Sequence, residues 1–210
     1  MASQISHIVY AKRYFDQLEA GEIESAIKIN REEFILGCVF PDIRRIDSKI
    51  KRRDTHLAYD PVDLNFSGLS SFAAGWKFHL YCDMRREDIL NKYKFYEFPH
   101  TTDFHNQPAK DLEDELVYGE YNNWEKLVYY FNNPPQVDYE LDFDPASFFL
   151  WYAMIARYIE KQPDEKTTRA FLVKQPGLLA NLDGIISSLS ELRKNEKVKE
   201  ILGRVWQEIV

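Results

Sequence analysis

Two side chains that can bind a metal ion lie four positions apart near the middle of the chain. His79 and Asp83 belong to the run FAAGWKFHLYCDMRRED at residues 72–88, whose apolar spacing predicts a helix. Residues four apart on a helix leave the same face, one turn apart. Because an imidazole and a carboxylate are both costly to bury without a partner, a shared cation is one explanation of the pair. The other explanation is an interior histidine that is hydrogen-bonded to an aspartate.

Further candidate ligands precede this pair in the sequence. Asp42 follows Pro41 at the end of the apolar run FILGCVFPD, His56 closes the segment RRDTH, and His7 lies in the first expected helix. Each of them has a plainer interpretation. By periodicity alone His7 is equally well a surface histidine on a tyrosine-rich face, and Asp42 taken alone is a solvated turn or cap residue.

Taken in order, these residues resemble the metal-binding pattern of the zinc-dependent phospholipase C family, whose fold also serves fungal single-strand nucleases. In that family an aspartate after an apolar helix, a later histidine and a helical His-x-x-x-Asp bind the first zinc ion. The last aspartate bridges to another zinc ion, which a histidine near the N-terminus helps to hold. The matching positions here are Asp42, His56, His79 and Asp83, with His7 for the second ion. The resemblance covers about the first 90 residues, and the interval of 14 residues from Asp42 to His56 agrees with it.

The chain also departs from the family pattern. The family has another histidine about six residues after the bridging aspartate, where this chain has Ile89, and a tryptophan at the mature N-terminus, where this chain begins MASQ. The third metal ion of the family therefore lacks its usual ligands. His100, Asp103 and His105, in the following loop, are candidates to replace them.

A strongly basic segment lies between Asp42 and His56. Six of the ten residues at positions 44–53 are basic, namely Arg44, Arg45, Lys49, Lys51, Arg52 and Arg53. On an acidic protein such a segment is usually a solvated loop or an ion-pair partner. Beside a metal ion it would instead hold an anionic substrate, because guanidinium groups match phosphate in a bidentate way. The candidate phosphate ligands are Arg44, Arg45, Arg52 and Arg53.

The resemblance implies a metal-dependent hydrolase of phosphoester bonds, most simply of phosphodiesters, with a small phosphorylated substrate. It assigns His56 and His79 as ligands and gives Asp42 a catalytic role as the base that orients a water molecule. Zinc, as one or two ions, suits two imidazoles and two carboxylates, although iron, manganese or nickel also bind such donors. The alternative is a non-catalytic helical protein with a structural metal ion or none. An HD-type phosphohydrolase is disfavoured because no histidine is followed directly by aspartate.

Composition narrows the class of protein further. The chain has 210 residues, 45% hydrophobic, with 14 Phe, 13 Tyr and 4 Trp, which indicates a folded globular protein. A net charge of -7 argues against a stable nucleic-acid or anionic-membrane partner. Cys38 and Cys82 lie in apolar segments and are expected to be buried free thiols of a reducing compartment. With no signal-peptide pattern and no run long enough to span a bilayer, we expect a cytoplasmic protein. The sequence does not specify an oligomeric state.

Periodicity predicts an all-α fold, a single helical domain in which residues 1–110 carry the metal site and residues 111–210 form a helical scaffold. We expect helices at residues 5–18, 22–38, 67 or 70 to 93, 111–131, 145–159, 164–174, 177–194 and 196–209. Residues 95–109 are too interrupted by proline for a regular element. The acidic run Asp138, Glu140, Asp142 and Asp144 lacks the glycine and terminal glutamate of a calcium-binding loop, so we expect it to be exposed.

Overall fold

The structure is a computed structural model that describes residues 3–57, 59–137, 141 and 144–210. Over these residues it forms eleven α-helices and three short 3-10 helices and no strand, which confirms the all-α class. The α-helices are α1 (Gln4–Ala20), α2 (Arg31–Val39), α3 (Arg52–Thr55), α4 (Ser71–Lys92), α5 (Asp103–Val117), α6 (Trp124–Asn132), α7 (Pro145–Ile159), α8 (Glu165–Leu172), α9 (Pro176–Leu179), α10 (Leu182–Leu192) and α11 (Glu196–Glu208). The 3-10 helices are η1 (Phe40–Arg45), η2 (Phe95–Glu97) and η3 (Tyr118–Glu120).

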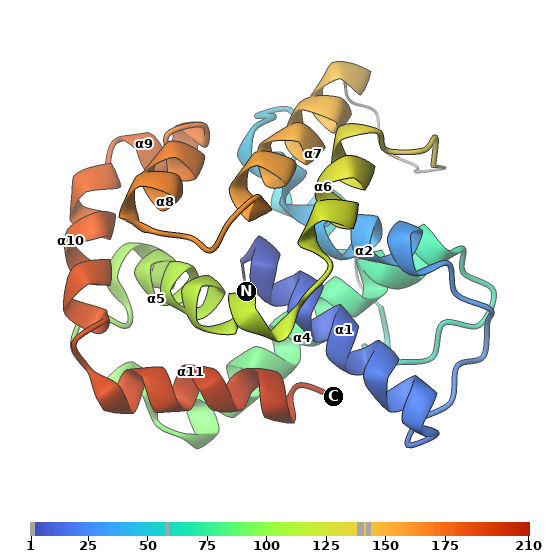
Figure 1. Ribbon diagram of the computed structural model, residues 1–210, viewed down its shortest axis with the longest axis horizontal. Coiled ribbons are helices and arrows are strands. Elements are labelled where there is room, and N and C mark those ends of the chain that lie inside the picture. Colours follow the sequence, from blue (N-terminus) through green and yellow to red (C-terminus); the bar gives the residue numbers. More distant parts are fainter. Residues whose placement is uncertain (1–2, 58, 138–140, 142–143) are drawn as a thin grey trace.

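Helix α1 runs through the centre of the molecule and contacts α2, α4, α5 and α11 (Figure 1). It ends at Ala20, and the left-handed backbone of Gly21 (φ 71°) closes the helix. In Figure 1, α5, α10 and α11 lie to the left of α1, and α2, α6 and α7 lie above it. A side chain on α1 can therefore meet side chains from both halves of the chain.

The most extensive helix contact is between α2 and α4, and two glycines permit it. A Cβ atom on Gly75 would overlap the carbonyl oxygen of Phe34, and one on Gly37 would overlap that of Phe72. Only glycine, which has no Cβ, allows the two helices to approach this closely at these positions. Ser70 caps α4 by accepting the backbone N–H of Ala73 at 3.2 Å, so the start and the end of this helix agree with the sequence prediction.

The second helix was predicted from residue 22, but residues 22–30 are not helical. Ser25 Oγ accepts the N–H of Ile27 at 3.3 Å and donates to its carbonyl at 2.9 Å, a local turn that competes with helical hydrogen bonds. The Asn30 side chain then accepts the N–H of Glu33, and this cap starts α2. Pro41 follows the end of α2 as expected, and the chain continues as η1.

The predicted helix at residues 111–131 is two α-helices, α5 and α6, separated by η3 and residues 121–123. The Tyr118 ring stacks on Trp124, whose indole N–H donates to the Tyr118 carbonyl at 3.1 Å, so the chain folds back over this break. Residues 95–109 are more regular than predicted, because α5 begins among them. Regular helical geometry starts at Gln107 after three left-handed residues, and Pro108 then occupies the first turn, where its missing N–H is tolerated.

The second half follows the prediction more closely. Asp144 caps α7, with Pro145 in the first turn. The predicted helix at residues 177–194 is divided into α9 and α10, because the N–H of Asn181 bonds to Leu178 in a tight turn. Asp138, Glu140 and Asp142 of the acidic run lie outside the described residues. No helix in the described part of the chain is both long enough and apolar enough to cross a membrane.

Candidate metal centre

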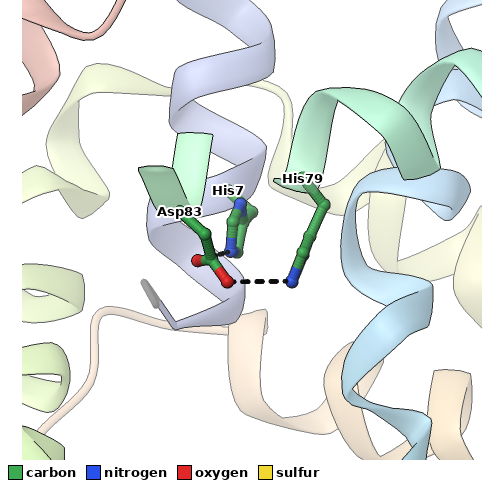
Figure 2. Close-up of side chains that lie close together, drawn as sticks. All are labelled: His7, His79 and Asp83. Atoms are coloured by element: carbon green, nitrogen blue, oxygen red, sulfur yellow. Dashed lines mark ion pairs between the residues drawn. The ribbon is translucent and has the colours of Figure 1, made fainter. Parts of the chain in front are cut away.

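His7, His79 and Asp83 converge in the interior, between α1 and α4 (Figure 2). His79 and Asp83 leave one face of α4, as their spacing predicts, and α1 brings His7 against them. The rings of His7 and His79 stack with their centroids 3.9 Å apart. One ligand atom from each of the three residues lies within 4.8 Å of the others. Helix packing thus brings together donors that are more than seventy positions apart in sequence.

A third histidine faces the same carboxylate from the end of α3. His56 Nε2 lies 3.7 Å from Asp83 Oδ2, and His79 Nε2 lies 3.6 Å from that oxygen. His7 Nε2 lies 3.5 Å from the other oxygen, Oδ1. Asp83 therefore presents one oxygen to His56 and His79 and the other to His7, the arrangement that a bridging carboxylate requires.

These separations are longer than hydrogen bonds and match the geometry of metal ligands. An N–H···O hydrogen bond spans roughly 2.7 to 3.2 Å between heavy atoms. Two ligand atoms that are each about 2.1 Å from a tetrahedral zinc ion lie about 3.4 Å apart. The Nε2 atoms of His7, His56 and His79 are all buried, and none has a hydrogen-bond partner among the described residues. Three imidazole nitrogens thus face one carboxylate at distances that would suit a shared metal ion.

The remaining ring nitrogens orient two of the histidines. His79 Nδ1 lies 2.7 Å from the Cys38 carbonyl, and His56 Nδ1 lies 3.1 Å from Thr55 Oγ1. A hydrogen bond from Nδ1 leaves Nε2 as the lone-pair nitrogen that binds a metal ion. Burial and the neighbouring His7 lower the pKa of His79 to about 3, so His79 is neutral at physiological pH.

Asp83 is held as an anion. Burial alone would raise its pKa, but the imidazoles of His79, His56 and His7 lower that pKa well below its usual value. The side chain is only 10% exposed. A nearly buried carboxylate and three imidazoles form a donor set of the kind found in zinc sites.

Asp42, predicted as both ligand and base, is fully buried in a different set of contacts. It accepts a hydrogen bond from Gln4 at 2.9 Å and pairs with Arg45 at 3.1 Å and Arg44 at 3.4 Å. Burial would raise its pKa, but Arg45, His79 and Arg44 lower it far below the usual range. Asp42 is therefore held by Gln4 and two arginines in this structure, and as a base it would be weak.

A hollow of about 350 Å³ opens beside the histidines. It is lined by Arg52, His56, Leu57, Leu80, Asp83, Met84 and Glu87. Of the four arginines predicted to hold phosphate, only Arg52 borders this hollow. Arg53 is 87% exposed and pairs with Asp54, whereas Arg44 and Arg45 line another cavity.

The residues proposed to replace the third metal site are occupied elsewhere. His100 Nδ1 lies 2.9 Å from Asp103 Oδ2, and that oxygen also accepts the hydroxyl of Ser188 on α10 at 2.7 Å. His105 lines the cavity that contains Arg44 and Arg45. Of the loop candidates, Asp103 thus contacts α10 and also pairs with His100, whereas His105 lies at a second cavity. Cys38 and Cys82 are buried free thiols, as predicted, and burial raises the pKa of both.

Sequence reasoning missed a second buried polar cluster beside the first. Arg86 Nε donates to Glu113 at 2.7 Å, Tyr10 donates to the same carboxylate, and all three residues are fully buried. Asp114 accepts the N–H and the hydroxyl of Ser6. One signal was available in the run KDLED at residues 110–114. Charges on every side of a packed helix require some of them to face inward.

Comparison with known proteins adds no relative: no protein-family description, no curated protein and no solved structure matches this chain.

Proposed function

We propose that this protein is a metal-dependent hydrolase of phosphoester bonds, whose single helical domain is related to the phospholipase C and single-strand nuclease fold. Its metal centre consists of His7, His56, His79 and Asp83. One observation carries this proposal. Three buried imidazole nitrogens without hydrogen-bond partners among the described residues lie 3.5 to 3.7 Å from one ionised carboxylate, and His7, His79 and Asp83 each offer a ligand atom within 4.8 Å of the others.

The surroundings of the four residues suit a phosphorylated substrate. A zinc ion held there would polarise a phosphoryl oxygen and lower the pKa of a water molecule. Arg52, on the rim of the hollow, supplies the positive charge that orients a phosphate group. The hollow of about 350 Å³ fits a small phosphodiester. The free thiols Cys38 and Cys82 favour a reducing compartment such as the cytoplasm.

A structural metal ion is the second candidate, and burial favours it. His7 and His79 have no exposed surface, and only Asp83 and His56 reach the hollow. An ion enclosed by four protein ligands stabilises a fold without an open position for substrate. The two candidates share the ligand set and differ in turnover.

Metal content tests the ligand set directly. Protein purified without a histidine tag or chelator should contain about one or two ions per chain after zinc is offered, measured by inductively coupled plasma mass spectrometry. Asp83→Asn and His79→Ala should each lose this metal ion, because each removes a donor. His100→Ala, which removes an exposed histidine outside the centre, is the matched control and should keep it. Equal metal content in all four proteins would overturn the ligand assignment.

Turnover then separates the two candidates. The zinc-loaded protein should hydrolyse bis-p-nitrophenyl phosphate, and Arg52→Gln should raise KM more than it lowers kcat, because Arg52 orients the substrate phosphate. The exposed Arg53→Gln is the control for loss of one arginine. Bound metal without turnover, when zinc, iron, manganese and nickel are offered in turn, would identify the ion as structural.

A further inference from the structure

A second cavity, here called the basic cavity, shares no lining residue with the hollow beside Asp83. It has a volume of about 520 Å³ and lies between η1, the start of α5 and α9. Its lining residues are Arg44, Arg45, Ile46, Ser48, Phe104, His105, Gln107, Lys110, Gln175, Pro176, Gly177 and Leu178. This lining contains two arginines, a lysine and a histidine but no carboxylate, in a protein whose net charge is -7.

Two of these cations are buried and held in place. The Arg45 side chain is 9% exposed, and its Nη1 donates to the side-chain oxygens of Gln107 and Gln175, at 3.2 Å each. Lys110 is 3% exposed, and its Nζ donates to the His105 carbonyl at 3.0 Å. An ammonium group has three N–H donors, so this bond leaves two of them for a ligand.

The two buried carboxylates beside the basic cavity differ in their charge. Asp42 is ionised and pairs with both arginines, with Arg45 at 3.1 Å and with Arg44 at 3.4 Å. Asp111, next to Lys110, does not neutralise the lysine, because burial raises the pKa of Asp111 to about 8. Burial, together with Arg45 and Arg86, lowers the pKa of Lys110 to about 7. An anion in the cavity would favour the charged form of Lys110 and raise its pKa.

The backbone at residues 104–106, beside the cavity, is strained. Phe104, His105 and Asn106 have consecutive positive φ angles of 49°, 55° and 55°, which residues other than glycine rarely adopt. The turn places the His105 carbonyl on Lys110 Nζ and the Phe104 ring in the cavity wall. The strain is therefore located where the lysine is positioned.

We propose that the basic cavity binds a small organic phosphate, with its phosphate group between Arg44, Arg45 and Lys110 and its carbon portion against Phe104 and Leu178. A phosphate monoester carries a charge of about -1.5 to -2 near neutral pH, which suits a cavity lined by two arginines, a lysine and no carboxylate better than a single carboxylate does. Low exposure of Arg45 and Lys110 strengthens the attraction, because the surroundings screen it less than water does. The site is separate from the metal centre and does not depend on it.

Calorimetric titration in the presence of a chelator tests the site without the metal centre. Glycerol 3-phosphate and inorganic phosphate should bind with a Kd of about 0.1 to 1 mM, and glycerol should not bind. Lys110→Met and Arg44→Gln should each weaken binding by about tenfold or more, because each removes a charged donor. Arg53→Gln, from the same basic segment but outside the cavity, should bind as the wild type does.

Two results would overturn the proposal. One is the absence of binding of either phosphate by folded wild-type protein. The other is binding that Lys110→Met and Arg44→Gln leave unchanged, which would place the anion elsewhere. Circular dichroism of each variant establishes that it is folded. Because Arg44 lies on the partly exposed rim, Arg44→Gln still tests phosphate binding if Lys110→Met does not fold.

Discussion

Helices α4 and α5 bury charged side chains, whereas α7 to α11 bury apolar ones and keep their charges at the surface. The buried charged residues in the described part of the chain all precede residue 115, and they are Asp42, Asp47, Lys77, Asp83, Arg86, Lys110, Asp111, Glu113 and Asp114. After that point, the buried polar residues among those described are Thr168, Gln175 and Ser188, none of them charged. Because a buried charge is costly without a partner, the first half is where partners must be sought.

The first half also contains two different solutions to the burial of charge. Glu113 has its partners within the protein, since Arg86 and Tyr10 both donate to it. The histidines around Asp83 leave three Nε2 atoms without a hydrogen-bond partner among the described residues. Nη1 and Nη2 of Arg86 are also buried without a hydrogen-bond partner among the described residues. The clusters differ in composition, because the first already pairs a cation with an anion, whereas the second groups three imidazoles around one carboxylate. This difference separates a structural ion pair from a candidate binding site.

The largest effect on stability is expected from Glu113→Gln. Glutamine has nearly the same shape as glutamate but no negative charge. The variant therefore leaves Arg86 buried and charged without its anionic partner. Removal of one partner of a buried ion pair costs about 3 to 5 kcal/mol, and urea unfolding at pH 7 measures this change.

The control for this prediction removes both charges. Arg86→Met combined with Glu113→Leu should recover most of the stability, because an apolar pair of similar volume replaces the ion pair at little cost. A loss below about 1 kcal/mol in Glu113→Gln would mean that Arg86 does not depend on this carboxylate.

A smaller, pH-dependent effect is expected from Asp111→Asn. Burial raises the pKa of Asp111 to about 8 in the folded protein, against about 3.9 in the unfolded chain. Between about pH 4 and pH 8 the folded state therefore holds one more proton, and the free energy of unfolding falls as pH rises, by about 1.4 kcal/mol per pH unit. The asparagine variant stays neutral and can still accept the Gln107 hydrogen bond.

Urea unfolding at pH 5 and pH 8 measures this slope. Wild-type protein should lose more stability than Asp111→Asn between the two values. Asp183→Asn, which changes an aspartate of α10 that is 92% exposed, should follow the wild type. Parallel curves for all three proteins would show that Asp111 is ionised in the folded state.

Local features of the fold were predictable, and long-range ones were not. The spacing of His79 and Asp83 along one helix face and the start of α4 near residue 70 depend on neighbouring residues, and the structure confirms them. The loss of helix at residues 22–30 depends on the turn made by Ser25, which competes with helical periodicity.

Contacts between residues that are far apart in the sequence depend on tertiary packing and could not be predicted from local spacing. The sequence named His7 and His56 only through a family resemblance, and no spacing rule connects either of them to Asp83. The pairing of Arg86 with Glu113, 27 positions apart, gave no local signal either. The same holds for Arg45 and Lys110, which share the basic cavity although nothing in their spacing indicates it.

The smallest effect is expected in the second half, from Lys197→Ala. Lys197 Nζ lies 3.0 Å from Glu200, and both side chains are largely exposed. Solvent screens such a pair, and a lysine in the first turn of α11 also opposes the helix dipole. The free energy of unfolding should change by less than about 0.5 kcal/mol in urea titrations. A loss above about 1.5 kcal/mol would show that α7 to α11 depend on ion pairs as α4 and α5 do, and the contrast between the two halves would not hold.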